Sequence, residues 1–293
     1  MKQGRILKGI GGYYTVCDEQ GTLHTLKARG RFRKEDRTPL PGDWVCFEPP
    51  AAGMEGAMGD LLPRRNCLMR PRVANVDIVF AVLCAQNPAP DFLLLDKLCI
   101  NAYENQIEVC AVLNKADLAT EEQRSRFYAD YAPFHPLCVS TRTGEGKDPL
   151  LQQAAGKVAC LAGQSGVGKT SLVNLLLPGT QWQTGELSAK TSRGRHTTRH
   201  AELLLMANGG ALVDTPGFSL MELPLMEPNA LAEAYPEFAE HLGHCKFTGC
   251  LHDAEPGCAV KQAVEQGRIP IARWQRYTQL LKHVQEKWRN RYE

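Results

Sequence analysis

The stretch GQSGVGKT, residues 163–170, decides the fold, because it matches the pattern G-x-x-x-x-G-K-[ST] of a phosphate-binding loop. The apolar run VACLA precedes it and TSLVNLLL follows it, so the sequence predicts a strand, the loop and a helix in succession. Glycines in such a loop let backbone N–H groups turn toward phosphate oxygens, and the helix N-terminus adds its positive end. An ordinary glycine-rich turn is the structural alternative.

Two residues of this loop have specific expected roles. We expect Lys169 to contact the β- and γ-phosphates of a nucleoside triphosphate and the hydroxyl of Thr170 to bind Mg²⁺. Further along, DTPG follows the apolar run GALV, and there we expect Asp214 to bind Mg²⁺ through water and Gly217 to donate its N–H to the γ-phosphate. The predicted phosphate and magnesium contacts are Gly163, Gln164, Ser165, Gly166, Val167, Gly168, Lys169, Thr170, Ser171, Asp214 and Gly217.

The motif NKAD, which ends at Asp117, lies upstream of the phosphate loop and predicts a guanine reader. A carboxylate accepts both N1–H and N2–H₂ of guanine, and adenine offers neither donor. Polar mismatch of this kind discriminates by about 10⁴ to 10⁵. We expect Asn114 and Lys115 to hold the loop and cover the ring. The later loop VSTRTG places Ser140 where it could meet guanine O6. The expected ligands are GTP and GDP.

The polar, basic segment SAKTSRGRHTTRH, residues 188–200, has the composition of a switch loop, and a solvated basic loop is the alternative. Thr197 or Thr198 could place a hydroxyl on Mg²⁺, and we favour Thr198. In Ras-like proteins a glutamine soon after D-x-x-G orients the attacking water. Here FSLM follows Gly217, without glutamine or asparagine, so we expect slow intrinsic hydrolysis.

The order of these motifs is rotated. In a Ras-like GTPase the phosphate loop precedes the base reader, whereas here NKAD comes first. Residues 69–225 alternate apolar strand runs with helical segments, which predicts an α/β P-loop GTPase domain with a mostly parallel sheet. The runs around NGG predict a hairpin within it. We interpret the rotation as a circular permutation, which moves the chain ends and leaves each strand in its place.

Both flanks of this domain differ from it. Residues 1–68 hold the strand-like runs GGYYTVC, TLHTLKA and DWVCFEP, with PLPGD and EGAMGD as turns, and predict a small OB-fold barrel. Residues 226–293 are expected to be helical around a loop rich in Cys and His. On the last helix, spacings of three and four predict a packing stripe that consists of Trp274, Tyr277, Leu281, Val284 and Trp288.

The loop HCKFTGCLHDAEPGC predicts one structural Zn²⁺ per chain. Its ligands would be three thiolates and one imidazole, from Cys245, Cys250, His252 and Cys258. Four protein ligands leave no open position, so a catalytic zinc is not expected. The adjacent His244 is a lower-ranked alternative ligand, and four unligated side chains in a loop are the structural alternative.

Composition narrows the class of protein. The chain has 293 residues, a net charge of +2, 43% hydrophobic and 23% charged residues, which suits a multidomain globular protein. It has no apolar run of membrane-spanning length and no signal-peptide core at its start, so we expect a cytoplasmic protein. Most of the eleven cysteines, such as Cys84 and Cys110, stand singly in apolar runs and are expected to be reduced.

Taken together, these motifs resemble the circularly permuted GTPases of bacterial ribosome biogenesis, and most closely the ribosome-small-subunit-dependent GTPase A family. The resemblance rests on the barrel with PGD, on SRGRHTT and DTPGF, and on the C-terminal Cys, His and EPGC pattern. It implies the zinc ligand set above and a water-positioning role for the switch-loop His196. It also implies the small ribosomal subunit as partner, with ribosomal RNA as the main surface and a role in late assembly.

Two basic regions suit RNA contact. The window KARGRFRK, residues 27–34, interleaves cations with Phe32, although a solvated strand and loop is the alternative. The last helix adds cations off its apolar stripe, namely Arg273, Arg276, Lys282, Lys287, Arg289 and Arg291.

Two other classes of function compete with a subunit-dependent GTPase that works as a monomer. A metabolic P-loop kinase is disfavoured by NKAD and by the lack of a second-substrate motif. An RNA-binding module with a largely structural GTP site is disfavoured by intact Lys169, Thr170 and Asp214. Turnover measured with and without small subunits separates the three.

Overall fold

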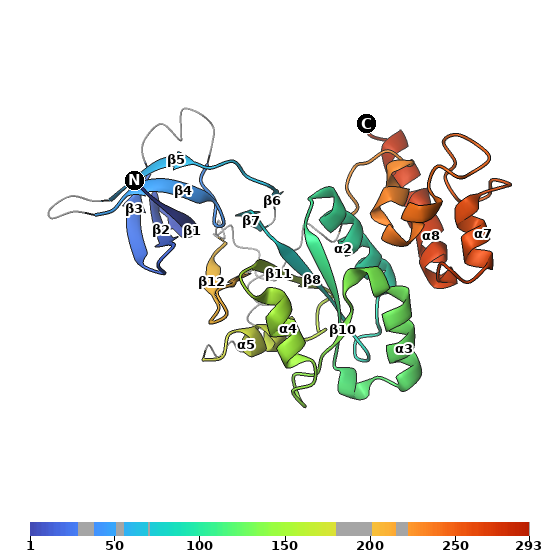
Figure 1. Cartoon of the computed structure of the whole chain (residues 1–293), viewed down its shortest axis with the longest axis horizontal. Coiled ribbons are helices and arrows are strands. Elements are labelled where there is room, and N and C mark those ends of the chain that lie inside the picture. The colour runs from blue at the N-terminus through green and yellow to red at the C-terminus, as the bar shows by residue number, and fades with distance from the viewer. Residues whose placement is uncertain (29–37, 51–55, 70, 180–200, 215–221, 293) are drawn as a thin grey trace.

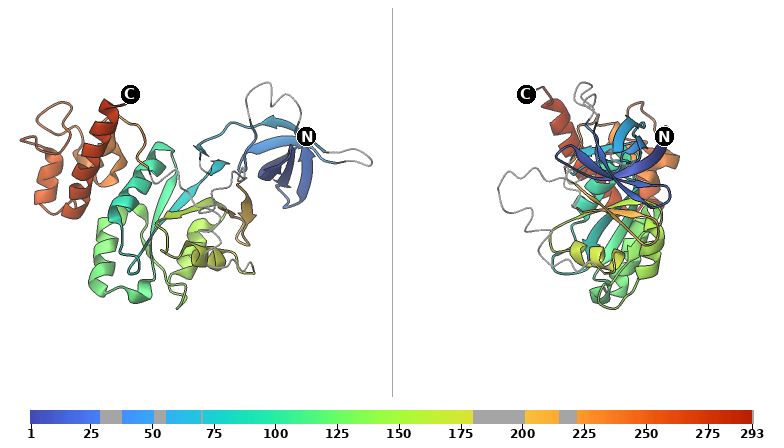
Figure 2. Two further views of the ribbon diagram at one scale, coloured as in Figure 1. Left: turned by 180° about the vertical axis from the view of Figure 1, so that it is seen from behind. Right: turned by 90° about the vertical axis from the view of Figure 1, so that its left-hand side faces the viewer.

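The computed structural model describes residues 1–28, 38–50, 56–69, 71–179, 201–214 and 222–292. A β-barrel, a central sheet with helices on both faces and a C-terminal helical part follow one another along the chain (Figure 1). Seen from behind, the barrel and the C-terminal helices lie at opposite ends of the central part (Figure 2). The described part of the chain contains no helix that is long and apolar enough to cross a membrane.

The barrel is formed by five strands: β1 Lys2–Ile10, β2 Tyr13–Asp18, β3 Leu23–Lys27, β4 Trp44–Glu48 and β5 Gly56–Leu61. They close in the order β1-β2-β3-β5-β4, which agrees with the predicted OB-type barrel. Alternate residues of the strands point inward and form its core: Ile6, Val16, Leu26, Val45, Phe47 and Met58.

The prediction of a turn at EGAMGD is wrong, because this segment is β5. Two of its glycines stand where a neighbour comes too close for a side chain. A Cβ on Gly56 would lie 2.5 Å from Leu26 Cδ2, and a Cβ on Gly59 would lie 2.6 Å from the carbonyl oxygen of Cys46. Glycine therefore serves close strand packing here. The sequence analysis also missed the small antiparallel pair β6 Cys67–Met69 and β7 Arg72–Ala74.

The central sheet has six strands: β8 Ile78–Cys84, β9 Glu108–Asn114, β10 Leu137–Cys138, β11 Val158–Gly163, β12 Leu203–Leu205 and β13 Ala211–Val213. Their order is β10-β9-β8-β11-β13-β12, and all neighbours are parallel except β12 and β13. That antiparallel pair is the hairpin predicted around NGG. In this sheet β13 and β12 lie on one side of β11, and β8, β9 and β10 lie on the other. The order of the motifs along the chain is therefore rotated, while the strands that carry them lie together in one sheet.

Among the residues that the structure describes, four α-helices cover this sheet: α2 Phe92–Glu104, α3 Glu121–Asp130, α4 Lys147–Ala154 and α5 Lys169–Leu176. Apolar residues of α2 and α3 pack on one face, and those of α4 and α5 pack on the other. Asp91 caps α2, because its Oδ1 accepts from the N–H of Leu94 at 2.9 Å. The short 3₁₀ helices η1 Ala116–Leu118 and η2 Ala132–Phe134 follow β9 and α3.

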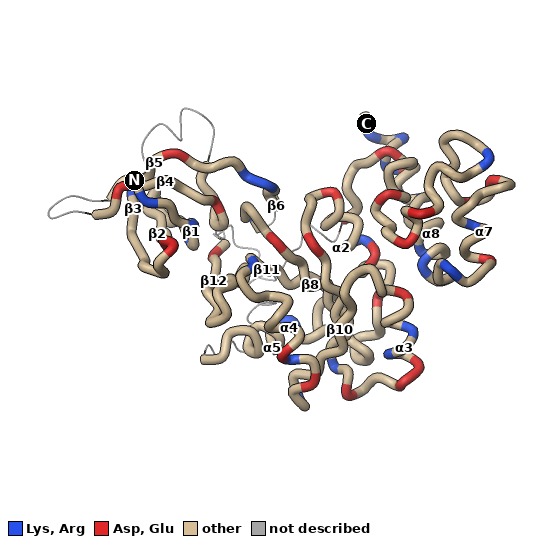
Figure 3. Tube along the Cα trace, in the orientation of Figure 1, with Lys and Arg blue, Asp and Glu red and all other residues tan. Residues whose placement is uncertain are grey.

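The C-terminal part consists of η4 Ala230–Ala234, η5 Pro236–His241, α7 Ala259–Glu265 and α8 Ile271–Arg289. The predicted stripe on α8 is confirmed as packing, since Tyr277, Leu281 and Val284 are buried and Trp274 packs against the same cluster. Trp288 is half-buried. Figure 3 shows acidic and basic residues in all three parts of the chain, which agrees with the small net charge.

Two of the cations that were expected to face RNA pair with carboxylates instead, one of them buried and the other half-buried. Arg273 is 1% exposed and donates to Asp96 of α2 and to Glu237 Oε1, the latter at 2.6 Å. Arg276 Nε donates to Asp96 Oδ2 at 2.8 Å. The prediction of RNA contact by these two residues is wrong, because their charges pair with carboxylates between α8 and the central domain. Arginine and lysine are seldom fully buried without such partners.

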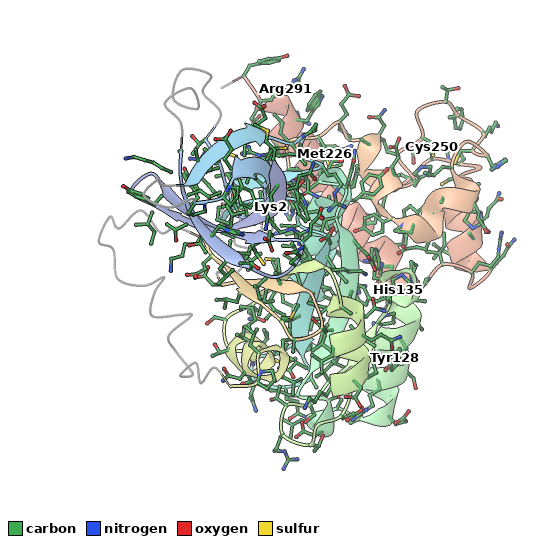
Figure 4. All side chains as sticks on the ribbon, turned by 60° about the vertical axis from the view of Figure 1, so that its left-hand side comes forward. Lys2, Tyr128, His135, Met226, Cys250 and Arg291 are labelled. Carbon is green, nitrogen blue, oxygen red and sulfur yellow. The ribbon has the colours of Figure 1, made fainter. Side chains whose placement is uncertain are left out.

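Residues 222–226, the described part of the segment after DTPG, pack against the central domain and the C-terminal helices. Leu223 and Met226 are buried, and Asn101 Nδ2 of α2 donates to the carbonyl oxygen of Glu222 at 2.7 Å. Lys287 Nζ of α8 donates to the carbonyl oxygen of Leu223 at 2.6 Å. Figure 4 labels Met226 near this junction. Residues 222–226 are therefore docked between α2 and α8.

Candidate nucleotide site and metal centre

The predicted nucleotide residues meet at one edge of the central sheet. Asn114 ends β9, Gly163 ends β11, Asp214 follows β13 and Ser140 lies just beyond β10. These four strands are parallel in the sheet, so their carboxyl ends share one edge. In open α/β sheets this edge is where ligands bind. Motifs that span a hundred residues are thereby brought together.

The phosphate loop needs its glycines for two different reasons. Gly163 has φ +150°, and a Cβ there would lie 2.2 Å from the carbonyl oxygen of Val82 on β8. Gly168 has φ +95°, and a Cβ there would lie 2.3 Å from Asn114 Nδ2. Left-handed backbone and close approach both exclude larger residues. The same Asn114 Nδ2 donates to the carbonyl oxygen of Val167 at 2.7 Å, so the base-reader loop holds the phosphate loop.

Lys169 is the cation at the end of this loop, where α5 begins. Its Nζ donates to the carbonyl oxygens of Gly163 and Gln164, each at 2.7 Å. Burial disfavours the charged ammonium and lowers the pKa of Lys169 to about 8. Lys169 and Thr170 begin α5, so the positive end of the helix dipole points to the loop. Among the described residues, the buried Gln164 Oε1 and Asn114 Oδ1 have no hydrogen-bond partner, which is expected of a site whose polar groups serve a ligand.

The carboxylate of Asp117 is held from two sides. Ser140, which is fully buried, donates its Oγ–H to Asp117 Oδ1 at 2.6 Å, and Arg142 Nε donates to Oδ2 at 2.8 Å. The hydrogen bond from Ser140, and then the contact with Arg142, lower the pKa of Asp117, so it is ionised at neutral pH. Sequence reasoning placed Ser140 at guanine O6. The structure instead places its hydroxyl on Asp117.

Lys115 bridges the base-reader and phosphate loops, as expected of a residue that covers the ring. It has φ +54°, and its Nζ donates to the carbonyl oxygen of Gly166 at 3.0 Å and to that of Asn87. A second link between these loops was not predicted from the sequence. Arg124 of α3 pairs with Glu145 through both guanidinium nitrogens and donates to the carbonyl oxygen of Ala116 at 2.6 Å. Glu145 stands in TGEG, directly after VSTRTG, which is a weak signal without the fold.

The remaining nucleotide predictions concern the γ-phosphate side. Asp214 Oδ1 accepts from the N–H of Glu202 at 3.1 Å, across the hairpin of β12 and β13. Thr170 lies on α5, which follows β11, and Asp214 follows the neighbouring strand β13. Their oxygen atoms are of the kind that Mg²⁺ prefers, so these residues fit a magnesium site. The predicted residues His196, Thr197, Thr198 and Gly217 lie outside the described residues.

The four predicted zinc ligands form one cluster, whose ligand atoms lie within 4.8 Å of one another. Figure 4 labels Cys250 in this loop. Cys245 Sγ lies 3.5 Å from His252 Nδ1 and 3.9 Å from Cys258 Sγ, and His252 Nδ1 lies 3.4 Å from Cys258 Sγ. A tetrahedral Zn²⁺ with bonds of about 2.3 Å to sulfur and 2.0–2.1 Å to nitrogen would set these distances at roughly 3.5–3.8 Å. The cluster therefore fits one zinc ion, with Nδ1 as the histidine ligand.

Helix α8 holds the loop of the zinc ligands through two hydrogen bonds. Trp274 Nε1 donates to the carbonyl oxygen of His252, and Tyr277 Oη donates to that of Leu251, each at 2.8 Å. The N–H of Ala259 points to Cys245 Sγ at 3.4 Å, which favours the thiolate that a metal needs. His244 is exposed and is not part of the cluster, so the preference for His252 is confirmed.

Comparison with known proteins agrees with this geometry. Residues 61–224 match the RsgA GTPase family, and residues 3–57 match the RsgA N-terminal domain. The chain belongs to the RsgA GTPase family. It is 43% identical over 284 residues to "Small ribosomal subunit biogenesis GTPase RsgA" of Moorella thermoacetica, covering 96% of this chain and 97% of the relative. The RsgA of Clostridium beijerinckii is 39% identical, with 99% of each chain covered.

Solved structures give the same answer for the fold. YjeQ from Thermotoga maritima has a TM-score of 0.84 at 32% identity, covering 97% of this chain and 98% of that one. YloQ, described as a circularly permuted GTPase, has a TM-score of 0.83 at 32% identity, covering 98% and 96%. The predicted barrel, permuted GTPase domain and Cys₃His cluster are therefore confirmed. As an RsgA GTPase, the chain hydrolyses GTP to GDP and phosphate and needs Mg²⁺.

Proposed function

We propose that the chain binds the small ribosomal subunit, hydrolyses GTP on it and acts late in its assembly. The observation that carries the enzymatic half is the convergence of Asp117, Lys169 and Asp214 on one edge of the sheet. The names of its relatives, which are small ribosomal subunit biogenesis GTPases, support the ribosomal half of the proposal. We further propose three functional units, an RNA-binding barrel at 1–68, the GTPase domain at 69–225 and a zinc-binding helical domain at 226–293.

The proposed nucleotide contacts are supported by the geometry of the described residues and, for Thr198, by the sequence alone. The N–H groups of residues 163–171 face the phosphates from the loop and from the first turn of α5. Lys169 exchanges its two carbonyl acceptors for phosphate oxygens, which favours its ammonium form. Asp117 reads the two donors of guanine, while Asn114 and Lys115 hold its loop against the phosphate loop. When bound through Thr170, Thr198 and a water on Asp214, Mg²⁺ supplies charge neutralisation at the β- and γ-phosphates.

We propose His196 as the residue that positions the attacking water, since an apolar residue follows Gly217 where a glutamine would serve. A neutral imidazole suits this task near pH 7. His196→Ala should lower turnover on small subunits at least tenfold and leave GDP affinity within twofold. An equal fall in turnover and GDP affinity would indicate a binding role instead.

The docked linker supports a coupled switch. Residues Glu222 to Met226 lead from DTPG to the C-terminal helices and contact both α2 and α8. We propose that a change in DTPG on hydrolysis reaches the helical domain through these contacts. We propose that the GTP form binds the subunit more tightly than the GDP form, that the subunit accelerates a slow basal turnover, and that the chain works as a cytoplasmic monomer.

The test is subunit affinity with a non-hydrolysable GTP analogue and with GDP, together with turnover with and without subunits. We expect at least fivefold tighter binding with the analogue and at least tenfold faster turnover with subunits. Linkage makes the affinity coupling reciprocal, so subunits must also tighten binding of the analogue. Equal affinities together with unstimulated turnover would favour the alternative, an RNA-binding module with a largely structural GTP site.

RNA contact is proposed to be electrostatic. Arg29, Arg31 and Arg33 lie outside the described residues, and we propose from their sequence context that they contact ribosomal RNA. Replacing all three by alanine should weaken subunit binding and flatten its dependence on salt. Unchanged affinity across a salt titration would move the RNA surface elsewhere on the chain.

A further inference from the structure

Arg142 covers the solvent side of the base-reading carboxylate. Its Nε donates to Asp117 Oδ2 at 2.8 Å, and its side chain is 74% exposed whereas that of Asp117 is 11% exposed. Ser140 reaches the other oxygen from within the protein, because it is completely buried. The small accessible part of Asp117 is therefore the part beside Arg142.

A guanine base has to approach from that same side. Its N1–H and N2–H₂ donors need both carboxylate oxygens, and the interior side of the carboxylate is already occupied by Ser140. A carboxylate accepts a limited number of well-aligned hydrogen bonds. The guanidinium on Oδ2 and the donors of the base therefore compete for one oxygen.

The backbone under Arg142 is anchored while its side chain is free to leave. The N–H of Thr143 donates to Ser140 Oγ at 3.2 Å, and the N–H of Gly144 donates to the carbonyl oxygen of Ser140 at 2.9 Å. Within the described part of the chain, the contact with Asp117 is the one ion pair of Arg142. Breaking it costs little, because exposed ion pairs are weak and screened.

We infer that Arg142 is a specificity-determining residue of the base site, which occupies Asp117 until a guanine base displaces it. The inference rests on the proposed role of Asp117. A ligand that replaces the guanidinium with two donors recovers the contact, and one without such donors cannot. A first step of binding is then the exchange of an internal ion pair for base hydrogen bonds.

The experiment measures binding of a ribose-labelled fluorescent GDP to the full chain in 50 mM, 150 mM and 1 M KCl. In 50 mM salt, Arg142→Ala should bind about 1.4- to 5-fold more tightly than wild type, the range expected for release of one exposed pair. The gain should shrink in 1 M salt, where charges are screened beyond about 3 Å. Tighter binding of GDP by Arg142→Ala would be informative, because the loss of a positive charge near an anionic nucleotide would by itself weaken binding.

Arg126→Ala is the matched control. It removes the same charge from the same domain, its side chain is 66% exposed, and its partner at 4.0 Å is Asp130 of α3. It should not tighten binding. A second arm repeats Arg142→Ala in an Asp117→Asn background with xanthosine diphosphate, where the gain should vanish because the carboxylate is gone.

The outcomes are separable. If wild type binds labelled GDP and Asp117→Asn shifts preference to the xanthine nucleotide, the proposed base reader holds. If Arg142→Ala then binds GDP equally or more weakly, Arg142 covers the bound base or is inert, and the inference is overturned. If Asp117→Asn leaves GDP preference unchanged, the proposed function of Asp117 fails first.

Discussion

Asp96 offers the strongest test of how the C-terminal helices are held. It lies on α2, and its side chain is fully buried. Its carboxylate accepts hydrogen bonds from Arg273, from Arg276 Nε at 2.8 Å and from Tyr131 Oη at 2.6 Å. Asp96→Asn keeps the volume of the side chain but removes its charge and turns an acceptor into an amide donor that faces two guanidiniums. Removing one partner of a buried pair typically costs about 3–5 kcal/mol. We therefore expect undocking of α8 from the central domain at lower denaturant concentration.

Urea unfolding followed by tryptophan fluorescence measures this, because Trp274 and Trp288 lie on α8. With a slope of about 2 kcal/mol per molar urea, the loss corresponds to a midpoint roughly 1.5–2.5 M lower for the transition that α8 reports. Glu108→Gln is the control, since Glu108 and its partner Lys157 are 40% and 31% exposed and the pair is worth about 1 kcal/mol or less. A midpoint shift for Asp96→Asn no larger than that of the control would refute the reasoning that buried charge joins the two parts.

Three further expectations concern the two sites. Asp117→Asn should weaken GTP binding and gain xanthosine triphosphate, because an amide can donate to the extra oxygen of xanthine, and retained GTP selectivity would contradict the base-reader assignment. Lys169 has a pKa of about 8 and phosphate favours its charged form, so affinity for GDP should be fully present below pH 8 and fall about fivefold to tenfold by pH 9; a flat profile between pH 7.5 and 9 would count against a phosphate contact. Wild type should hold about one Zn²⁺ per chain, Cys258→Ser should lose it and loosen the C-terminal part, and the half-buried Cys46→Ser should keep it, as checked by metal analysis and limited proteolysis.

Local patterns were sufficient where short-range chemistry sets the structure. Strand and helix alternation around GQSGVGKT predicted β11, its loop and α5. The permutation followed from motif order, since each motif has a fixed place relative to the sheet. The zinc ligands followed from residue type, because three thiols and an imidazole in one loop have few other uses.

Contacts between distant segments were decided only by the tertiary structure. The glycines of β5 led to the prediction of a turn, although they permit close strand packing in the barrel. Arg273 and Arg276 were predicted to form part of an RNA surface, although they pair with carboxylates from α2, α3 and η5. A single sequence shows a side chain's charge but not the partner that folding brings to it.

The base site divides in the same way. The sequence by itself predicted that Asp117 reads guanine and that a small-residue loop lies beside it, because both predictions depend on residue type and local order. Only the fold decided that Ser140 supports Asp117 from inside, that Arg142 covers it from outside, and that Arg124 ties the two loops together. Hydrogen bonds act over about 3 Å, and which groups come within that reach is set by how the whole chain packs.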